Sequence, residues 1–438
     1  MTPPGSPAPH GGPLSPRTGT AREVFGVFLR LGLTSFGGPV AHLGYFRDAF
    51  VVRRRWLGDR AYADLVALCQ FLPGPASSQV GMAIGLRRAG VRGLLAAWAG
   101  FTLPSAVLLV AFAYGVLAGG ADAGTGWIGG LKAAAVAVVA QAVLGMRRTL
   151  APDARRATIA GAAVVATLLA PAVPGLPVAL GQVAVIVLAG AAGLLWLPAS
   201  GRAPSGDAPG QDGKHGQQHD GEPDDDQFTV PVRRRAALGC LALFGALLLV
   251  LPLVAATTGD GFARLVDVFY RAGSLVFGGG HVVLPLLQAE TVPSGLVAHD
   301  QFLAGYGAAQ AVPGPLFTFA AYLGAVTTSG PTGLAGAATA LVAVFLPSAL
   351  LVVGALPFWE RLRHAPRARR ALAGVNAGVV GLLAAALYDP VLTQGVLAAD
   401  DPLVALALAV AAFVALVTWS APPWAVVIAA GLIGWALL

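Results

Sequence analysis

The sequence contains two copies of one pattern. Residues 30–39 read R-L-G-L-T-S-F-G-G-P and residues 271–280 read R-A-G-S-L-V-F-G-G-G, so both stretches carry R-x-G-x-x-x-F-G-G. Two shorter patterns recur in the same order, with Q-x-x-P-G-P starting at 70 and 310 and L-P-S starting at 103 and 346. The three offsets are 241, 240 and 243 residues. A fixed order at a near-constant offset indicates an internal duplication, so the fold must consist of two related halves.

Composition places both halves in a membrane. The 438 residues are 56% hydrophobic and only 11% charged, whereas soluble domains carry about 25% charged residues. The 58 glycines and 32 prolines suit membrane helices that are broken or closely packed. We therefore expect an all-α polytopic membrane protein. The two cysteines, Cys69 and Cys240, both lie in apolar segments, so we expect no disulfide framework.

Local composition divides the chain further. Residues 1–20 are rich in Pro, Gly and Ser and have no apolar run, which predicts a disordered tail rather than a signal peptide. We expect the first half at 21–198, a polar linker at 199–235, a transmembrane helix at 236–260 that inverts the chain, and the second half at 261–438. The His and Asp residues of the linker resemble a metal-binding tract, but such composition is more often a solvated linker, so no metal site is expected.

The basic residues predict topology. Loops 47–60 and 87–92 are both rich in arginine, and short basic loops face the cytoplasm. Only one apolar segment, 64–86, separates them, and P-G-P breaks it at 73–75. We therefore expect a re-entrant hairpin, whose arms of about 10 residues extend about 15 Å and reach the midplane of a core about 30 Å thick. The tail and the linker are then cytoplasmic. The isoelectric point of 9.9 reflects these loops and not nucleic-acid binding.

The second half shows the opposite charge bias. Its basic loop 358–370 corresponds to residues 119–127 of the first half, where the only charged residue is Asp122. An inverted bias predicts inverted-topology repeats with broken or re-entrant helices. The resulting arrangement has about nine full spans and four hairpins. The alternative is about 13 simple spans of about 20 residues each.

Three basic residues, Arg30, Lys132 and Arg271, lie inside apolar segments. A charge there costs at least about 2.5–3.5 kcal/mol on insertion scales, so each is a functional hypothesis. Arg30 and Arg271 occupy equivalent positions, and two converging guanidinium groups could bind a tetrahedral dianion through bidentate hydrogen bonds. Alternatively, each arginine orients its hairpin at the interface or pairs with Asp64 or Asp267.

The broken segments supply a second set of candidates. Glycine lets the backbone approach a ligand, and a helix that restarts after a break directs its positive N-terminus toward an anion. Hydroxyl and amide groups in the first turn, including Gln79, can add donors. The alternative is that Gly and Pro only permit tight helix packing. The candidate binding residues are Phe36, Gly37, Gly38, Pro73, Gly74, Pro75, Ser77, Ser78, Phe277, Gly278, Gly279, Pro313, Gly314, Pro315 and Thr318.

Other polar residues are candidates for coupling or gating. Lys132 aligns with Asn376, and two histidines lie near the F-G-G breaks without occupying matched positions. Histidine can sense protons near neutral pH, and carboxylates near segment ends can carry them. The alternatives are a lysine–carboxylate pair, a hydrogen-bonded histidine at a helix end, and ordinary interfacial solvation. The full set is Lys132, Asn376, His42, His281, Asp64 and Asp267, with Glu23 and Glu290 as further proton carriers.

The repeated F-G-G and P-G-P patterns resemble the chromate ion transporter family in its long, two-half form, over roughly residues 21–419. The resemblance implies a multi-pass protein of the bacterial plasma (inner) membrane that exports chromate and confers chromate resistance. The oxyanion would bind between the inverted repeats, and the chain would need no cofactor and no nucleic acid. The fused halves remove the need for a partner chain and leave a homodimer open.

Two other functions stay open at this point. A carrier of sulfate or another oxyanion fits the same residues, because sulfate and chromate share charge and shape. A membrane-embedded enzyme acting on lipid or quinone belongs to a different class, and it would need acids and histidines gathered at one interface. The sequence has no Walker A loop, no G-x-S-x-G elbow and no zinc helix motif. We therefore expect a secondary transporter rather than an enzyme.

Overall fold

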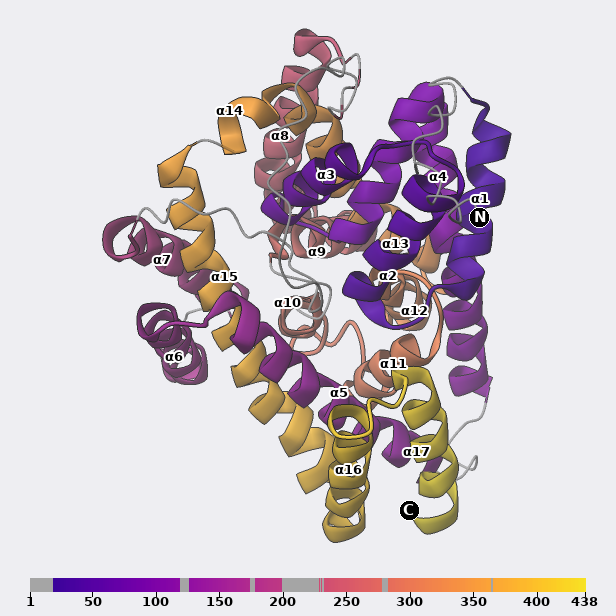
Figure 1. The fold of residues 1–438 in the computed structure, drawn as a ribbon. Coiled ribbons are helices and arrows are strands. Elements are labelled where there is room, and N and C mark those ends of the chain that lie inside the picture. The colour runs from indigo at the N-terminus through magenta and orange to yellow at the C-terminus, as the bar shows by residue number, and fades with distance from the viewer. Residues whose placement is uncertain are drawn as a thin grey trace, which may run out of the picture.

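The computed structural model describes residues 19–118, 126–173, 178–198, 228, 230, 232–277, 283–363 and 365–438, and every regular element in these ranges is a helix (Figure 1). The first half contains α1 (Ala21–Thr34), α2 (Gly38–Arg47), η1 (Asp48–Arg53), α3 (Asp59–Phe71), α4 (Ala76–Ala118), α5 (Gly126–Leu150), α6 (Ala154–Leu169), η2 (Ala170–Ala172) and α7 (Val178–Trp196). After α8 (Arg234–Thr258), the second half contains α9 (Gly261–Leu275), α10 (Val283–Thr291), α11 (His299–Ala311), η4 (Leu316–Thr318), α12 (Phe319–Val326), α13 (Gly333–Ala355), η5 (Leu356–Phe358), α14 (Trp359–Arg363), α15 (Pro366–Ala386), η6 (Leu387–Leu397), α16 (Pro402–Val417) and α17 (Pro423–Leu437). The predicted tail and most of the predicted linker lie outside the described residues.

The predicted helix breaks are confirmed. The F-G-G pattern separates α1 from α2, and the first P-G-P turn separates α3 from α4. The second P-G-P turn separates α11 from η4. Gly74 and Gly314 in the two turns have φ of 116° and 93°, a region that residues with a Cβ atom rarely enter. The second F-G-G break is described only to Phe277, because residues 278–282 lie outside the described ranges.

Both broken segments of the first half start and finish at one end of the molecule. The Gly19 N–H donates to the Arg88 carbonyl over 2.9 Å, and the Arg88 guanidinium lies 3.1 Å from the Glu23 carboxylate. The same guanidinium stacks 4.7 Å from the centre of the Trp56 ring. The start of α1, the loop before α3 and the kink of α4 at Ala89–Gly90 therefore meet. This is the geometry of two re-entrant hairpins.

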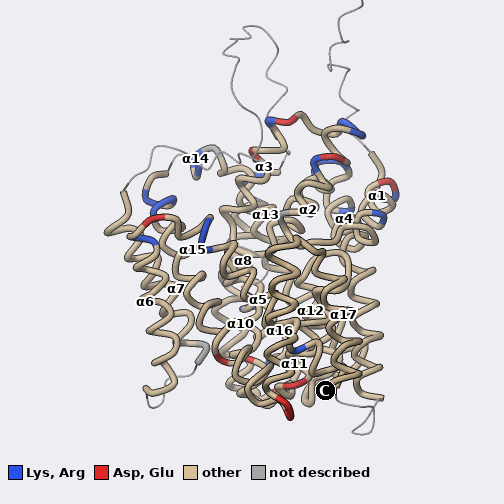
Figure 2. Tube along the Cα trace, turned by 60° about the horizontal axis from the view of Figure 1, so that its bottom comes forward, with Lys and Arg blue, Asp and Glu red and all other residues tan. Residues whose placement is uncertain are grey.

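The halves point in opposite directions. Figure 2 shows Lys and Arg concentrated at one end of the molecule, which we call the basic end. Helix α5 carries Arg147 and Arg148 in its last turn, whereas its counterpart α15 carries Arg367, Arg369 and Arg370 near its start. These helices therefore run antiparallel. In the same view α1, α2 and α3 lie toward the basic end and α10 and α11 toward the other, as inverted repeats require.

Helix lengths favour hairpins over simple spans. Five described helices are long and apolar enough to cross a membrane, namely Ala76–Ala118, Gly126–Leu150, Arg234–Thr258, Gly333–Phe358 and Pro366–Leu397. By contrast, α1, α2 and α3 have 14, 10 and 13 residues, so even α1 extends only about 21 Å. The reading with about 13 simple spans does not fit these lengths. That α6, α7, α16 and α17 complete nine crossings stays a prediction.

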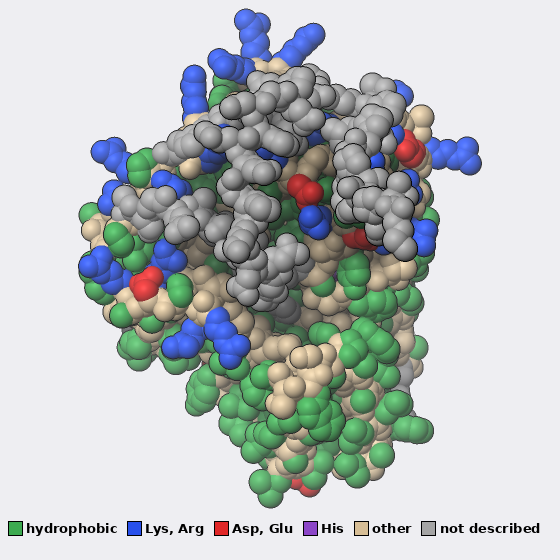
Figure 3. All heavy atoms as spheres, in the orientation of Figure 1, with side chains coloured by type: hydrophobic (Ala, Val, Ile, Leu, Met, Phe, Trp, Pro, Cys, Tyr) green, Lys and Arg blue, Asp and Glu red, His purple; other side chains and the backbone are tan. Residues whose placement is uncertain are grey.

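The outer surface suits lipid. Figure 3 shows hydrophobic side chains over the lower part of the visible face and Lys and Arg around its upper part. Large apolar side chains are widely exposed, including Leu195, Leu403, Trp419 and Trp435. Exposed apolar area on this scale marks a membrane or partner surface. Together with the long apolar helices, it indicates a polytopic membrane protein.

Equivalent glycines pack both halves in the same way. Gly32 of α1 faces the backbone of α4, and a Cβ atom there would lie 2.7 Å from the Gly100 carbonyl oxygen. Gly273, which is 241 positions later, faces α13, and its Cβ would lie 2.1 Å from the Val344 carbonyl oxygen. Small residues allow such close helix contact in membranes. The duplication therefore preserved the packing that positions each F-G-G break.

Candidate functional site

The four breaks interlock across the two halves. The Gly74 N–H donates to the Val276 carbonyl over 2.7 Å, and the Gly314 N–H donates to the Ser35 carbonyl over 2.8 Å. Ser35 and Val276 are equivalent residues of the two F-G-G patterns, and Gly74 and Gly314 are the equivalent central glycines of the P-G-P turns. Each P-G-P turn is thus hydrogen-bonded to the F-G-G break of the other half. Such reciprocity requires a pseudo-two-fold axis through this point.

The L-P-S pattern completes the interlock. The Ser105 hydroxyl donates to the Pro313 carbonyl, and an added Cβ at Gly314 would meet the Ser105 oxygen at 2.2 Å. An added Cβ at Gly74 would likewise meet the Ser348 oxygen at 2.4 Å. Each L-P-S serine therefore lies against the P-G-P turn of the opposite half. Sequence analysis did not assign these serines a role, although their recurrence at matched positions was the available signal.

Buried polar atoms collect where the four breaks meet, which we call the junction, and most of them come from the first half. The hydroxyl oxygens of Ser35, Ser78 and Thr102 and the amide oxygen of Gln79 have no hydrogen-bond partner within the described chain. These residues are at most 3% exposed. A buried polar atom without a partner costs about 1–3 kcal/mol, so native proteins keep few of them. Four in one region indicate a binding site for a polar ligand.

The local fold explains why these groups converge. Ser77, Ser78 and Gln79 form the first turn of α4, directly after the P-G-P turn. His42 of α2 lies 3.4 Å from the Ser77 oxygen through Nδ1, and its ring packs edge-on at 5.3 Å from Phe101, the neighbour of Thr102. The hydrogen-bonding groups therefore come from the starts of α2 and α4 and from the second part of α4. Helix N-termini carry partial positive charge and bind anions.

In both P-G-P turns, residues that follow the turn donate hydrogen bonds to the carbonyl oxygens of the turn. The Gln79 side-chain amide donates to the Pro73 carbonyl over 2.6 Å, and the Gln79 N–H donates to the Pro75 carbonyl over 2.9 Å. In the second half the Thr318 hydroxyl donates to the Pro315 carbonyl over 2.7 Å. The Pro73, Pro75 and Pro315 carbonyl oxygens, which would repel an anion, are thereby occupied, whereas the Gln79 amide oxygen has no partner within the described residues. Phe36 lies farther out, 5.9 Å from the Trp424 ring of α17.

The second half is apolar where the first half is polar. At matched positions, Val276 replaces Ser35, Phe317 replaces Ser77, Phe319 replaces Gln79 and Phe345 replaces Thr102. All four replacements are buried. Thr318 and Ser348 are the polar exceptions. The Thr318 hydroxyl is bonded to its own turn, whereas the buried Ser348 hydroxyl has no partner within the described residues. The junction is therefore symmetric in backbone and asymmetric in side-chain chemistry.

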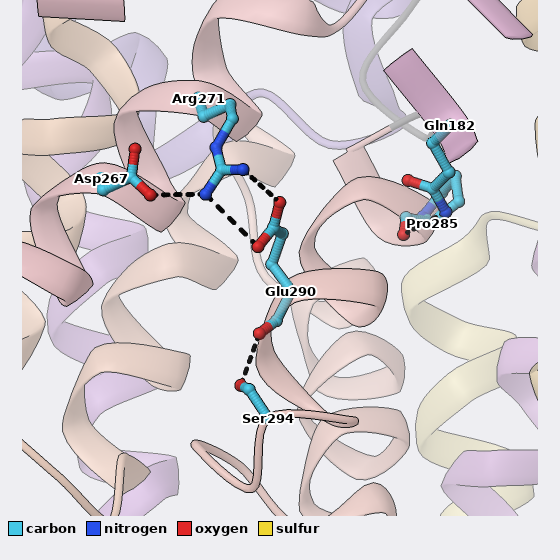
Figure 4. Close-up of polar contacts among 6 residues, drawn as sticks. All are labelled: Gln182, Asp267, Arg271, Pro285, Glu290 and Ser294. Atoms are coloured by element: carbon cyan, nitrogen blue, oxygen red, sulfur yellow. Dashed lines mark hydrogen bonds and ion pairs between the residues drawn. The ribbon is translucent and has the colours of Figure 1, made fainter. Parts of the chain in front are cut away.

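The charges of the second half form a separate cluster, drawn in Figure 4. Arg271 Nη2 lies 2.5 Å from Asp267 Oδ2, and Arg271 Nη1 lies 3.0 Å from Glu290 Oε1. The Glu290 carbonyl accepts from the Ser294 hydroxyl over 2.5 Å, and nearby the buried Gln182 of α7 donates to the Pro285 carbonyl over 3.2 Å. The guanidinium of Arg271 is thus shared by two carboxylates that link α9 to α10.

The two predicted arginines have different surroundings. Gly26 and Ala49 occupy the first-half positions that match Asp267 and Glu290, 241 residues earlier. Arg30 is exposed on α1 and forms no ion pair with any described residue. The structure does not bring the two guanidinium groups into one cluster. For Arg271 the pairing alternative holds, whereas Asp64 pairs with Arg363 over 3.3 Å.

The remaining coupling candidates are dispersed. Lys132 Nζ lies 2.6 Å from Asp300 Oδ1, joining α5 of one half to α11 of the other. The buried Asn376 oxygen has no partner within the described residues. Gly278, Gly279 and His281 lie outside the described residues. No group of three or more His, Cys, Asp or Glu in the described ranges could hold a metal ion.

Comparisons with known proteins agree with this duplicated arrangement. A family model described as "Chromate transporter" matches the chain twice, at residues 22–194 and 263–435. A chromate transport protein of Pseudomonas aeruginosa is 29% identical over 378 residues, covering 84% of this chain and 80% of that protein. A chromate transport protein of Cupriavidus metallidurans is 27% identical over 382 residues, covering 84% and 82%. An uncharacterized transporter of Methanocaldococcus jannaschii is 33% identical over 91 residues, covering 21% and 22%. No solved structure matches.

Proposed function

The chain belongs to the chromate transporter family, and from that membership we propose that it is a secondary transporter that exports chromate from the cytoplasm across the bacterial inner membrane and so confers chromate resistance. Two relatives that align over 84% of the chain are named chromate transport proteins. The sequence carries no nucleotide-binding loop that would supply ATP energy. An ion gradient or the membrane potential then drives the export of the dianion.

The observation that supports this proposal most strongly is the reciprocal interlock of the breaks. Gly74 and Gly314 tie the two halves together through equivalent hydrogen bonds, and buried polar atoms without partners lie beside them. Inverted repeats move substrate by rocking one half against the other around a central site formed by broken helices. We place the oxyanion at this junction, between the halves.

Orientation follows from charge. The basic end carries arginines of the loops 47–60, 87–92 and 358–370, and short basic loops stay in the cytoplasm. The N-terminal tail and the linker belong to the same side in this assignment. Chromate would then enter from the basic end and leave at the other.

Uptake of labelled chromate into inverted membrane vesicles tests the proposal. An exporter accumulates chromate in energised inverted vesicles, and collapsing the gradient abolishes the accumulation. Absence of gradient-dependent accumulation would contradict export. Sulfate is the control ligand, because a sulfate carrier with incidental chromate handling would take up labelled sulfate faster than chromate. A membrane-embedded enzyme would accumulate neither anion.

A further inference from the structure

We propose that uncharged donors, most of them from the first half, hold the oxyanion, while the second half supplies the Ser348 hydroxyl, an apolar wall and no guanidinium. This inference rests on the proposed function and specifies its binding site. The donors are the hydroxyls of Ser35, Ser78 and Thr102, that of Ser348 from the second half, the backbone amides in the first turn of α4, and His42. The ligand class is a fully ionised tetrahedral oxyanion, such as chromate or sulfate.

The geometry around Gly314 brings these groups together. The Gly314 N–H reaches the Ser35 carbonyl at 2.8 Å, and an added Cβ at Gly314 would lie 3.2 Å from the Phe101 carbonyl oxygen. Ser35 and Thr102 are therefore neighbours across one turn of backbone. His42 joins the first turn of α4 through Ser77 and contacts Phe101. Ser35 and Thr102 thus lie beside the second P-G-P turn, and His42 links them to the first turn of α4, which contains Ser78.

The three basic residues that could bind the oxyanion instead are either paired with carboxylates or exposed. Both terminal nitrogens of Arg271 bind carboxylates, so an oxyanion would have to displace Asp267 or Glu290 to bind them. Arg30 is exposed on α1 and forms no ion pair with any described residue. Lys132 is paired with Asp300. By contrast, the hydroxyls of Ser78 and Thr102 are buried and without partners among the described residues.

Uncharged donors also suit transport. Hydrogen bonds from hydroxyls, backbone amides and a helix N-terminus stabilise an anion in a low-dielectric site without placing a full positive charge there. The anion can then leave without separating an ion pair. The apolar side chains at the matched second-half positions, Val276, Phe317, Phe319 and Phe345, exclude water from the opposite side. Hydroxyl donors recognise the oxygens and not the central atom, so sulfate should compete with chromate.

Equilibrium binding to the purified full-length protein tests the assignment. Titrations of sodium sulfate and potassium chromate by calorimetry are compared for wild type, Ser78→Ala, Thr102→Val and Thr102→Ser. Loss of one hydrogen bond to a charged ligand weakens binding about 10-fold to 100-fold, so Ser78→Ala and Thr102→Val should each weaken both anions at least about 10-fold. Thr102→Ser keeps the hydroxyl and should stay within about threefold of wild type.

Two buried second-half residues give matched controls. Thr291 and Ser274 are 1% and 2% exposed, and each hydroxyl bonds a carbonyl of its own helix. Thr291→Val and Ser274→Ala should bind both anions within about twofold of wild type. Wild-type affinity in both Ser78→Ala and Thr102→Val would overturn the inference while leaving export intact if vesicle uptake persists. If the wild-type protein neither binds nor transports chromate, the proposed function fails together with it.

Discussion

The two halves share a backbone but not a chemistry. Gly74 and Gly314 make equivalent hydrogen bonds, and Gly32 and Gly273 make equivalent helix contacts. The side chains differ. The first half places three hydroxyls without partners among the described residues at the junction and the second half only that of Ser348, while the second half places a carboxylate–guanidinium cluster within its own hairpin.

This comparison separates scaffold from function. The first half builds its hairpin with Gly26 and Ala49 where the second half has Asp267 and Glu290, so the hairpin itself does not need the charges. Likewise, the second half forms its break with Val276 where the first half has Ser35. The residues that duplication conserved determine where the chain bends. The residues that diverged determine what each half does there.

The largest expected effect comes from breaking the shared scaffold. Gly74→Ala and Gly314→Ala each place a Cβ atom within 2.4 Å of a serine oxygen, at positive φ. Both should abolish chromate uptake in inverted vesicles, and to the same extent, because the two contacts are equivalent. Gly259→Ala is the control, since Gly259 also has positive φ but nothing within 4 Å of the added atom; its cost should be about 1 kcal/mol. Retained uptake in only one of the two junction variants would show that the halves are not interchangeable as scaffolds.

Replacing the repeated arginine should destabilise the protein in the second half only, and the effect should be smaller than that of the glycine variants. Arg271→Ala leaves Asp267 and Glu290 without the guanidinium that they share, and removing one partner of a buried ion pair costs about 3–5 kcal/mol. Arg30→Ala removes an exposed side chain that forms no ion pair with the described residues, and it should cost less than about 0.5 kcal/mol. Unfolding free energies in detergent measure both. Equal costs would mean that Arg30 has a buried partner after all.

Cysteine labelling in a Cys240→Ser background tests which end of the molecule faces the cytoplasm. Arg54 lies at the basic end and Ser329 in the loop between α12 and α13, and both are exposed. An impermeant thiol reagent added to intact cells should label Ser329→Cys and spare Arg54→Cys. Inverted vesicles should reverse the result. Labelling of both from the same side would rule out inverted hairpins.

The smallest expected effect concerns the Lys132–Asp300 pair between the halves. The Lys132 side chain is only 16% exposed, but its partner Asp300 is 71% exposed and well solvated. Ion pairs that reach solvent contribute about 0–1 kcal/mol. Lys132→Met should therefore change the free energy of unfolding by at most about 1 kcal/mol. Asn376→Ala, at the matched second-half position, gives the comparison. A loss above about 2 kcal/mol for Lys132→Met would show that this pair holds the halves together.

Backbone features could be predicted from the sequence because glycine and proline act locally. The repeated F-G-G and P-G-P patterns gave the breaks, and the arginines of loops 47–60 and 87–92 gave the hairpin between them. The Asp267–Arg271 pair is also local, at the i, i+4 spacing of one helix. Glu290 reaches the same arginine across a break, and no local pattern indicates that contact.

Ser78 is among the residues predicted from the sequence because it follows a P-G-P turn, whereas Ser35 and Thr102 are not. Serine and threonine in apolar helices commonly bond a carbonyl one turn earlier, as the Ser274 hydroxyl does with Tyr270. Sequence cannot separate such residues from Ser35, whose oxygen has no partner in the described chain. The difference depends on which helices meet, and that is set by the fold of both halves together.

The most direct measurement is an experimental structure of the full-length protein with chromate or sulfate bound. We expect density for a tetrahedral anion at the junction of the four breaks. The anion should lie within hydrogen-bond distance of Ser78, at the start of α4, and of Thr102, in its second part. Density bound to Arg30 or Arg271 instead, away from the P-G-P turns, would contradict it.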